Sequence, residues 1–495
     1  MNAKFPQKKG MSSVRNRMAK AILSLGIIGM SGLGILPITH ALALNAVPEI
    51  YRLQDTAQPT DPLVTSSTFG LDFKTLYLLA QQRDPIYESA RYNLEAVAQR
   101  VPQARAGLLP TVAANAGQSR NRGFYTFATN PETERKVQAW NWNLQLNQPL
   151  LRWQNWQSYN QAEAQLAQAE AQTEQAEQEL ILRLAQAYFE YNLADENLRV
   201  INAQIRAVEL QRQAVQKSFA AGTKPIMDVY EAQARYDSGQ AQRVLAQNDL
   251  TTKKINLEKI VGPLPAQTRS LSVTQALPLP EPLDLESWRQ QAIDYSPVVR
   301  AQMAAMQAAE YEIKKNFAGH LPTLDLVGSI NSNYSSGSNT TPSDYDSRIR
   351  SRQIGLQLSV PLFAGGGTDA KVKESVALHY KARADVENTK REISATAQQA
   401  YAGVLSGASA ISALESAIIS NQNSVTANQV GYRLGTRNNT DVLNAEQQLA
   451  TAQRDLLKAR YDMLLNGLKL KAAVGGLNEQ VVNAINQLFI PSPAP

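Results

Sequence analysis

The sequence contains no cysteine, and its 495 residues include only 3 histidines. Without cysteine the chain can form no disulfide bond, no thiolate metal site, no cysteine nucleophile and no lipid anchor at an N-terminal cysteine. His40 lies in an N-terminal apolar segment, and His320 and His379 are too few to hold a metal ion by themselves. No nucleophile, base or cofactor-binding motif is recognisable either. We therefore expect no enzyme activity, no cofactor and no metal centre, which argues against an exported hydrolase.

Net charge is also absent once the N-terminal segment is set aside. Residues 1–43 combine a basic stretch, an apolar run and the small-residue site Ala41-Leu42-Ala43, which is the pattern of a secretory signal peptide. The alternative is a transmembrane anchor, but glycines and a proline interrupt the run. Removal of this segment leaves 43 Lys+Arg against 43 Asp+Glu. A neutral chain with no basic cluster predicts no nucleic-acid partner.

Two long stretches lack proline, and the first also lacks glycine. Residues 150–221 are rich in Gln, Ala, Glu and Leu, which predicts a helix over about 151–221. The second stretch predicts a helix over about 368–430, which Gly403 and Gly407 would loosen. Turns at 222–225 and 435–438 lead into return helices expected over about 228–261 and 441–474. Each long helix thus belongs to an antiparallel hairpin, and the return helix could lie end to end with the helix that precedes the strands.

The apolar stripe on these helices is narrow and rich in alanine. A broad apolar face would indicate a compact bundle, so the narrow stripe favours a helical wall with two wet sides. A free coiled coil is the alternative that the helices alone leave open.

The second half of the chain repeats the first. Leu109-Pro110-Thr111 returns 212 positions later as Leu321-Pro322-Thr323, and Gly222-Thr223 returns 213 positions later as Gly435-Thr436. One inserted residue aligns the halves, so each half is a structural unit. The expected divisions are a flexible leader at 44–70, a first repeat at 71–262, a linker at 263–284, a second repeat at 285–476 and a C-terminal tail at 477–495.

Each repeat carries two expected strands before its long helix, within about 109–150 and 321–362. Large apolar residues alternate there with uncharged amides, as in a membrane barrel with lipid outside and water inside. An ordinary half-buried sheet is the alternative, but its polar face would more often carry charges. The residues expected to face lipid are Trp140, Trp142 and Leu144, and those expected to face the lumen are Asn141, Asn143 and Gln145. Known membrane barrels have about eight strands or more, so several chains must contribute.

The order and spacing of several motifs resemble those of the TolC family of outer-membrane export ducts. The motifs are the signal peptide, the duplication, the Leu-Pro-Thr before each first strand, the Gln-Pro-Leu and Val-Pro-Leu-Phe that close the second strands, the turn Tyr-Arg-Leu-Gly-Thr-Arg-Asn-Asn-Thr-Asp-Val-Leu-Asn-Ala and the late Val-Gly-Gly-Leu-Asn-Glu-Gln. The similarity covers about residues 71–482. It implies a mainly α fold with a transmembrane β portion, in which a homotrimer forms a twelve-strand β-barrel continued by a twelve-helix α-barrel. Members of the family are not enzymes, and they join an inner-membrane transporter and a periplasmic adaptor to expel proteins or small toxic molecules.

By this resemblance, the two helix turns form a periplasmic aperture. Asp441 aligns with a ring of gate aspartates, and Tyr432 and Arg437 align with residues that constrain the gate. Asp228 aligns with their acidic partner on the other hairpin. The residues alone leave another explanation open, because Asp228 and Asp441 both begin helices and Asp is a favoured N-cap, which contributes about 1 kcal/mol.

Two positions depart from the family pattern. Asn444 stands where many members carry a second gate aspartate, and Met227 replaces a smaller polar residue beside Asp228. The missing cysteine separates the chain from the lipid-anchored efflux branch. We predict a trimeric channel of the outer membrane that extends into the periplasm, in contact with outer-membrane lipid, for protein secretion or small-molecule efflux. The alternative is a periplasmic adaptor protein with coiled-coil hairpins, which would have one hairpin flanked by compact β-domains.

Overall fold

The two longest helices of the computed structural model follow the stretches that lack proline. Helix α5 spans Trp153–Ala220 and helix α9 spans Gly367–Arg433. Each is followed by a glycine with positive φ, Gly222 at +73° and Gly435 at +75°, a conformation that other residues avoid. The chain then reverses into the return helices α6 (Ile226–Val261) and α10 (Asn439–Ala473).

Residues 67–495 form one unit, to which all of the following description belongs. The structure describes residues 72–126, 131–264, 270–271, 277–337 and 345–490. The predicted signal peptide at 1–43 and the predicted leader at 44–70 lie outside the described residues.

Shorter helices precede the strands in both repeats. In the first repeat they are α2 (Phe73–Arg83), α3 (Pro85–Ala98) and α4 (Arg100–Ala106). In the second they are α7 (Leu285–Tyr295), α8 (Pro297–Phe317) and the 3-10 turn η3 (Ala318–His320). Pro85 and Pro297 stand in the first turn of α3 and α8, where a missing N–H costs nothing and the fixed φ suits a helix.

Four strands form a single antiparallel sheet in the order β1-β2-β4-β5. Their bounds are β1 Thr111–Tyr125, β2 Thr133–Leu151, β4 Thr323–Ser335 and β5 Ser347–Ser359. The β2–β4 ladder joins the two repeats, and its register shifts between Pro149 and Leu151, where proline has no N–H to donate. Strands β1 and β5 are the two edges of the sheet.

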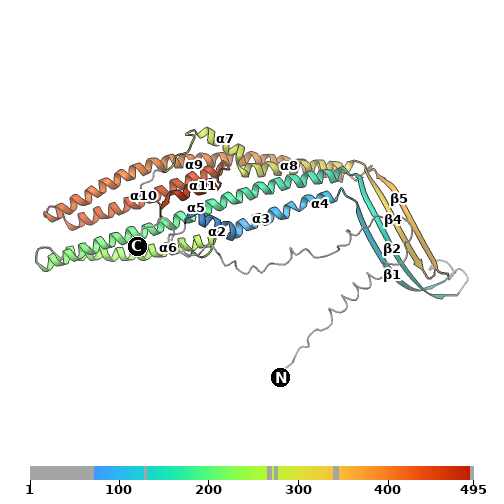
Figure 1. Cartoon of the computed structure of the whole chain (residues 1–495), viewed down its shortest axis with the longest axis horizontal. Helices are drawn as coiled ribbons and strands as arrows, with labels where there is room; N and C mark the ends of the chain where they lie inside the picture. The colour runs from blue at the N-terminus through green and yellow to red at the C-terminus, as the bar shows by residue number, and fades with distance from the viewer. Residues whose placement is uncertain (1–71, 127–130, 265–269, 272–276, 338–344, 491–495) are drawn as a thin grey trace, which may run out of the picture. The chain divides into compact units, whose positions relative to one another are not determined.

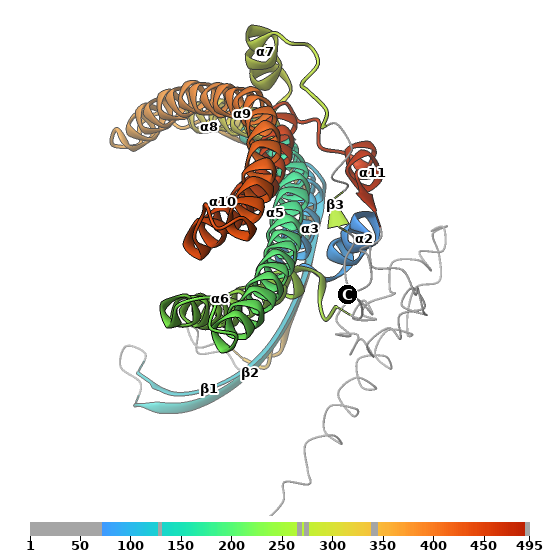
Figure 2. The ribbon, with the colours of Figure 1, turned by 90° about the vertical axis from the view of Figure 1, so that its left-hand side faces the viewer.

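The long helices pack in a single layer. Helix α5 contacts α6 and α10, and α10 contacts α9; Figure 2 shows these four helices along an arc. Nearer the sheet, α8 lies between α5 and α9, whereas α3 and α4 lie along the other side of α5 (Figure 1). The prediction that two shorter helices lie end to end beside each long helix is confirmed by these contacts.

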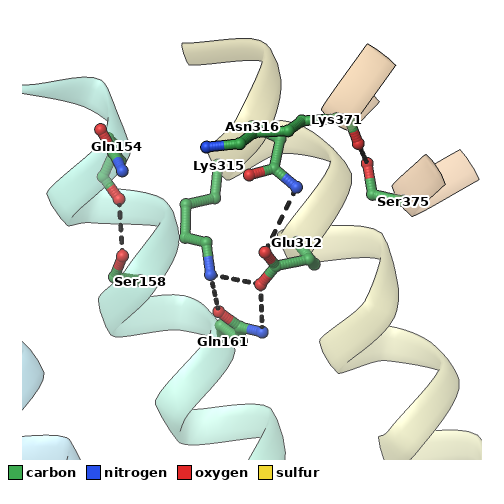
Figure 3. A network of polar contacts seen from close by, with 8 residues as sticks. All are labelled: Gln154, Ser158, Gln161, Glu312, Lys315, Asn316, Lys371 and Ser375. Atoms are coloured by element: carbon green, nitrogen blue, oxygen red, sulfur yellow. Dashed lines mark hydrogen bonds and ion pairs between the residues drawn. The ribbon is translucent and has the colours of Figure 1, made fainter. Parts of the chain in front are cut away.

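Polar contacts join the two repeats close to the sheet. The guanidinium of Arg152, between β2 and α5, donates to both carboxylate oxygens of Asp325 on β4 at 2.8 and 2.6 Å. More than two turns further along α5, Gln161 donates to Glu312 of α8 at 2.7 Å, and Lys315 contacts both (Figure 3). The repeats are therefore bonded to each other beside the sheet as well as through the β2–β4 ladder, and they do not form separate domains.

The predicted tail and linker both contain structure. Helix α11 (Glu479–Gln487) and strand β6 (Phe489–Ile490) follow the second repeat, and β6 pairs with β3 (Ser270–Leu271) from the linker. The ring of Phe489 lies 5.0 Å from that of Tyr188 and 5.8 Å from that of Phe189. The described part of the predicted C-terminal tail, residues 477–490, thus contains a helix and a strand, and its apolar residues complete the largest core cluster of the described chain.

Gly403 and Gly407 do not loosen α9, which is helical throughout. A side chain at Gly403 would meet Asn466 at 2.7 Å, and one at Gly407 would meet Met463 at 3.1 Å. Their role is close packing of α9 against α10. The helix bounds also differ from those expected: α9 extends to Arg433, and the return helices begin at Ile226 and Asn439, two residues earlier than predicted.

Among the described helices, α9 contains an 18-residue window with a mean hydropathy of 1.5, apolar enough by composition to cross a membrane. Only 6% of that window is buried. A single such helix is weak evidence for a membrane span, but it shows that α9 exposes an apolar surface that the chain itself does not cover.

Candidate functional site

The sheet separates polar from apolar residues onto two faces. The register places Asn143 between Asn115 of β1 and Asn331 of β4, and the amide of Asn115 donates to Asn143 at 3.0 Å. Directly opposite residues of antiparallel strands lie on the same face. The predicted lumen residues Asn141, Asn143 and Gln145 therefore share a face with further amides and hydroxyls, which carries no charge over this stretch.

The opposite face is apolar and exposed. Trp140, Trp142 and Leu144, the predicted lipid-facing residues, are 37%, 41% and 37% exposed. Across the sheet this face continues through Ile354 and Leu356 of β5, which are exposed by 77% and 67%. Such an apolar surface needs a partner or a lipid environment, because isolated proteins rarely expose one of this extent.

Three arginines continue the apolar face along β5. Arg348, Arg350 and Arg352 precede Ile354 at every second position, and all three side chains are exposed. These arginines were not predicted, because only the alternation from Ile354 onwards was interpreted as a strand face. The signal was present as Arg-x-Arg-x-Arg immediately before that run.

The turn into α10 is closed by a capping box. The side chain of Asn438 accepts the N–H of Asp441 at 2.8 Å, and the carboxylate of Asp441 accepts the N–H of Asn438 at 3.2 Å. The guanidinium of Arg437 lies 3.9 Å from the same carboxylate. The expectation that Asp441 is the N-cap was wrong in position, because Asn438 is the N-cap and Asp441 is the third helical residue.

The turn into α6 has no such box. Pro225 is the N-cap of α6 and offers no side-chain hydrogen bond, so Asp228 lies in the first helical turn without a capping role. Asp228 is half-buried, while its neighbour Met227 is 71% exposed. A carboxylate in the first turn still interacts favourably with the helix dipole.

The two turns contact each other through Tyr432. The ammonium of Lys224 lies 4.4 Å from the centre of the Tyr432 ring, which is a cation–π distance. Burial, and after it the negative charge of Asp228, raises the pKa of the Tyr432 hydroxyl above its usual range. Among the described residues no hydrogen bond joins Tyr432 or Arg437 to Asp228, so the structure brings the predicted gate residues near one another without the expected latch within one chain.

Further contacts between the hairpins were not anticipated. Arg235 of α6 donates to the side-chain oxygen of Asn444 on α10 at 3.0 Å, and Thr440 donates to Glu231 at 2.6 Å. Asn444 is therefore a bonding partner for the first hairpin. Single residues such as Arg235 and Glu231 carry no local sequence signal, because their partners lie more than 200 positions away.

Known proteins share this arrangement. The outer membrane efflux protein family matches residues 76–263 and 288–476, which are most of the two repeats. The proteases secretion protein PrtF of Dickeya chrysanthemi is 30% identical over 421 residues, which are 84% of this chain and 90% of PrtF. The outer membrane protein TolC of Vibrio cholerae is 30% identical over 426 residues, which are 86% of this chain and 95% of that protein.

Solved structures agree with the fold. CusC is similar with a TM-score of 0.72 at 18% identity, covering 84% of this chain and 96% of CusC. VceC of Vibrio cholerae is similar with a TM-score of 0.67 at 21% identity, covering 82% of this chain and 96% of VceC. The predicted fold, mainly α with a β portion, is confirmed. The adaptor alternative is not supported, because both hairpins of this chain join one four-stranded sheet.

Proposed function

The chain belongs to the outer membrane efflux protein family, and on this premise we propose that three copies assemble into one exit duct through the outer membrane and the periplasm. The protein is an outer-membrane channel component that serves export, as the resemblance to the TolC family predicted. The trimer is inferred from the sheet, which segregates amides from large apolar residues and has two open edges.

The open edges require other chains. Backbone N–H and C=O groups have no water to bind in the hydrocarbon region, so a spanning sheet must close on itself. Four strands are too few, whereas three copies supply twelve, an even number within the range of known outer-membrane barrels. We propose that β5 of one copy pairs with β1 of the next.

The helices give independent support for several copies. Helix α9 lies at one end of the helical layer and exposes apolar side chains, among them Ile419 at 65% and Leu405 at 38%. The neighbouring copy would cover this surface and continue the layer into a ring of twelve helices. At about 1.5 Å per residue, the 68 residues of α5 reach roughly 100 Å, long enough to project far into the periplasm.

The two faces of the sheet acquire separate roles in this assembly. Trp140, Trp142 and Leu144 would face lipid, and the amides of Asn141, Asn143 and Gln145 would line a water-filled, uncharged lumen. An uncharged hydrated wall offers a passing polypeptide few strong binding sites. The turns at the other end would form the aperture, with three copies of Asp441 around it and with Tyr432, Arg437, Asp228 and Asn444 at its rim.

Relatives suggest the kind of cargo and partner. PrtF and the alkaline protease secretion protein AprF of Pseudomonas aeruginosa match at 30% identity over 84% and 88% of this chain, whereas the cation efflux protein CusC of Escherichia coli matches at 23% over 60%. This difference favours secreted polypeptides as cargo. The partners would be a periplasmic adaptor and an inner-membrane transporter that receives the polypeptide in the cytoplasm.

Assembly and conduction test the proposal together. The purified chain in mild detergent should have the mass of a trimer, and the trimer should form open or gated channels in planar bilayers. A stable monomer that conducts nothing would overturn it. For the cargo, deletion of the gene should remove specific proteins from the culture medium, and unchanged secreted proteins with increased drug sensitivity would favour efflux instead.

Cysteine accessibility tests the two faces. The chain contains no cysteine, so single cysteines report one site each. Cysteines at Asn141 and Asn143 should react with a small, membrane-impermeant thiol reagent at least tenfold faster than cysteines at Trp140 and Trp142. Equal rates would remove the assignment of lumen and lipid faces while leaving the trimer intact.

A further inference from the structure

The apolar face of the sheet becomes basic towards the hairpin tips. On β5, Leu358 and Leu356 lie near α9, whereas Arg352, Arg350 and Arg348 follow towards the end distant from the helices. Neighbours on one face of a strand are about 7 Å apart, so three positive charges stand in a short row. With the helices in the periplasm, this basic end of the face would lie at the outer leaflet.

In the described part of the chain, the acidic groups near the row leave most of its charge uncompensated. Arg348 lies over the ring of Tyr334 at 5.8 Å, and the hydroxyl of Tyr334 donates to Asp346 at 2.9 Å. Among the described residues, no carboxylate pairs with Arg350 or Arg352. The other carboxylate on this face, Glu134, is held by Arg122 and Lys136 of the first hairpin.

A shallow apolar groove runs to the foot of the same row. It has a volume of about 460 Å³ and is lined on this face by Val112, Leu144, Leu146, Ile330 and Ile354 around Gly328, with Arg352 at its rim. Gly328 has no side chain, which leaves the floor of the groove open. A linear hydrocarbon fits such a groove, and a phosphate attached to it would reach the arginines.

We propose that this groove and Arg350 and Arg352 form a binding site for a phosphate-bearing lipid of the outer leaflet. The acyl chain would lie over Gly328, and the phosphate would accept hydrogen bonds from the two guanidinium groups. The proposal rests on the proposed function in one respect, since this face must be the one exposed to lipid.

Charge and polarity together point to a lipid as the occupant. A soluble anion would need only the arginines, but here the arginines stand directly beside an exposed apolar surface. The rings of Trp140 and Tyr334 stack at 6.1 Å at the same level of the sheet as Arg348, where aromatic residues of barrels meet the headgroups. In the trimer, β1 of the next copy would close the site from the far side of β5.

Native mass spectrometry of the detergent-purified trimer tests the site. The probes are diphosphoryl lipid A, phosphatidylethanolamine of low net charge, and inorganic phosphate as a competitor. The wild-type trimer should retain diphosphoryl lipid A at least tenfold better than phosphatidylethanolamine, and millimolar inorganic phosphate should displace little of it. Arg350→Gln/Arg352→Gln and Gly328→Leu should each reduce retention about tenfold.

Matched controls separate the site from general effects. Arg383→Gln/Arg391→Gln removes the same charge from the exposed surface of α9, and Gly355→Leu places the same bulk on the opposite face of the sheet, where the structure leaves room. Neither should change retention. Equal loss in either control, unchanged retention in the arginine pair variant, or displacement by inorganic phosphate alone would overturn the proposal. Conductance in planar bilayers is measured in parallel. A trimer that conducts but binds no lipid would contradict this inference and leave the proposed function unaffected.

Discussion

The two repeats build the same reversal with the same residues and then differ in the next four positions. Thr223 and Thr436 both follow a glycine of positive φ, and their hydroxyls donate to the carbonyl oxygens of Ser218 and Gly431 at 2.9 and 3.2 Å. Beyond this shared turn, the second repeat closes its helix with a capping box and the first does not. The reversal is thus part of the scaffold, and the way in which the following helix is capped is specific to each repeat.

The same contrast occurs at the joint between the short helices. Asp84 is the N-cap of α3, is 2% exposed and pairs with Arg183 at 2.7 Å, whereas the equivalent Ser296 of α8 makes no side-chain capping bond. The residue equivalent to Arg183 is Thr396. The same fold therefore accommodates an ion pair at this joint in one repeat and two hydroxyl groups in the other. The helix break itself must come from the proline that follows, Pro85 or Pro297.

The sheet shows a third contrast. Trp140 and Trp142 of β2 occupy the positions equivalent to Arg352 and Ile354 of β5. Both strands are apolar towards the helices and end their apolar stretch with a residue suited to a membrane interface, which is Trp in one repeat and Arg in the other. The alternation belongs to the scaffold, and the choice between Trp and Arg distinguishes the repeats.

The largest expected effect on stability comes from replacing only one residue of the Asp84–Arg183 pair by its equivalent from the second repeat. Arg183→Thr leaves the buried carboxylate of Asp84 without its partner and should lower the free energy of unfolding by about 3 kcal/mol. Asp84→Ser/Arg183→Thr reproduces the pair of the second repeat and should recover most of that loss. Denaturant unfolding in detergent measures both, with Arg391→Thr on the exposed surface of α9 as control. A double variant as unstable as the single one would show that the repeats are not interchangeable here.

The second-largest effect is expected at a buried carboxyl group that only the first repeat has at this position. Glu196 of α5 accepts a hydrogen bond from Tyr461 at 3.1 Å, and burial raises its pKa to about 7. The equivalent residue is the exposed Ser409. Because the folded protein holds this proton more tightly than the unfolded chain, stability should fall as pH rises from about 4.5 through 7. Glu196→Gln should remove that loss and stabilise the protein by roughly 2–3 kcal/mol above pH 7, with little effect below pH 5.

Thermal unfolding between pH 5 and pH 8 measures this effect. The exposed Glu392→Gln variant is the control and should follow the wild type at every pH. If Glu196→Gln shifted the melting temperature equally at both ends of the range, the effect would be one of packing and not of the proton.

These contrasts also explain what the sequence could predict. Glycine, proline and helix-forming composition act locally, so the hairpins, the strand pairs and the breaks before Pro85 and Pro297 were predictable. The packing of Phe489 against Tyr188 was not, because it joins residues 301 apart and no local pattern encodes it. The spacing of the three arginines is present in the sequence. Their neighbours on the same face of the sheet were not predictable, because only the register of the strands shows them.

The candidate aperture was predictable in its members but not in its bonds. Resemblance identified Tyr432, Arg437, Asp228 and Asp441, and the structure places them at the two adjacent turns. The resemblance could not show that Asn438 takes the N-cap position or that Lys224 covers Tyr432. Both features depend on the geometry of a short turn and not on residue type alone.

The aperture offers a test of smaller effect, in which the two turns should respond differently. Three Asp441 carboxylates around a narrow mouth would attract cations, so Asp441→Asn should lower the ratio of cation to anion permeability severalfold. Asn keeps an oxygen that can accept the N–H of Asn438, so the helix start should survive. Arg437→Ser should instead raise the resting conductance by freeing the turn. Single-channel recording in planar bilayers measures both.

Asp228→Asn is the comparison variant, because Asp228 carries the same charge in the turn that has no capping box. Unchanged selectivity in Asp441→Asn, together with unchanged conductance in Arg437→Ser, would leave helix capping as the only role of the second turn.

The smallest expected effect concerns the caps themselves. Asn438→Ala removes the side chain that accepts the N–H of Asp441, which should weaken the start of α10 by about 1 kcal/mol, whereas Pro225→Ala removes no hydrogen bond from the start of α6. Hydrogen exchange followed by mass spectrometry resolves such local changes: peptides covering the start of α10 should exchange about fivefold faster in Asn438→Ala, and peptides covering the start of α6 should change less in Pro225→Ala. Equal acceleration at both helix starts would mean that contacts between the hairpins, such as the bond from Thr440 to Glu231, fix the two turns together. In that case the capping box would be redundant with the packing of the hairpins, and the two turns would be fixed equally firmly although only one of them has the box.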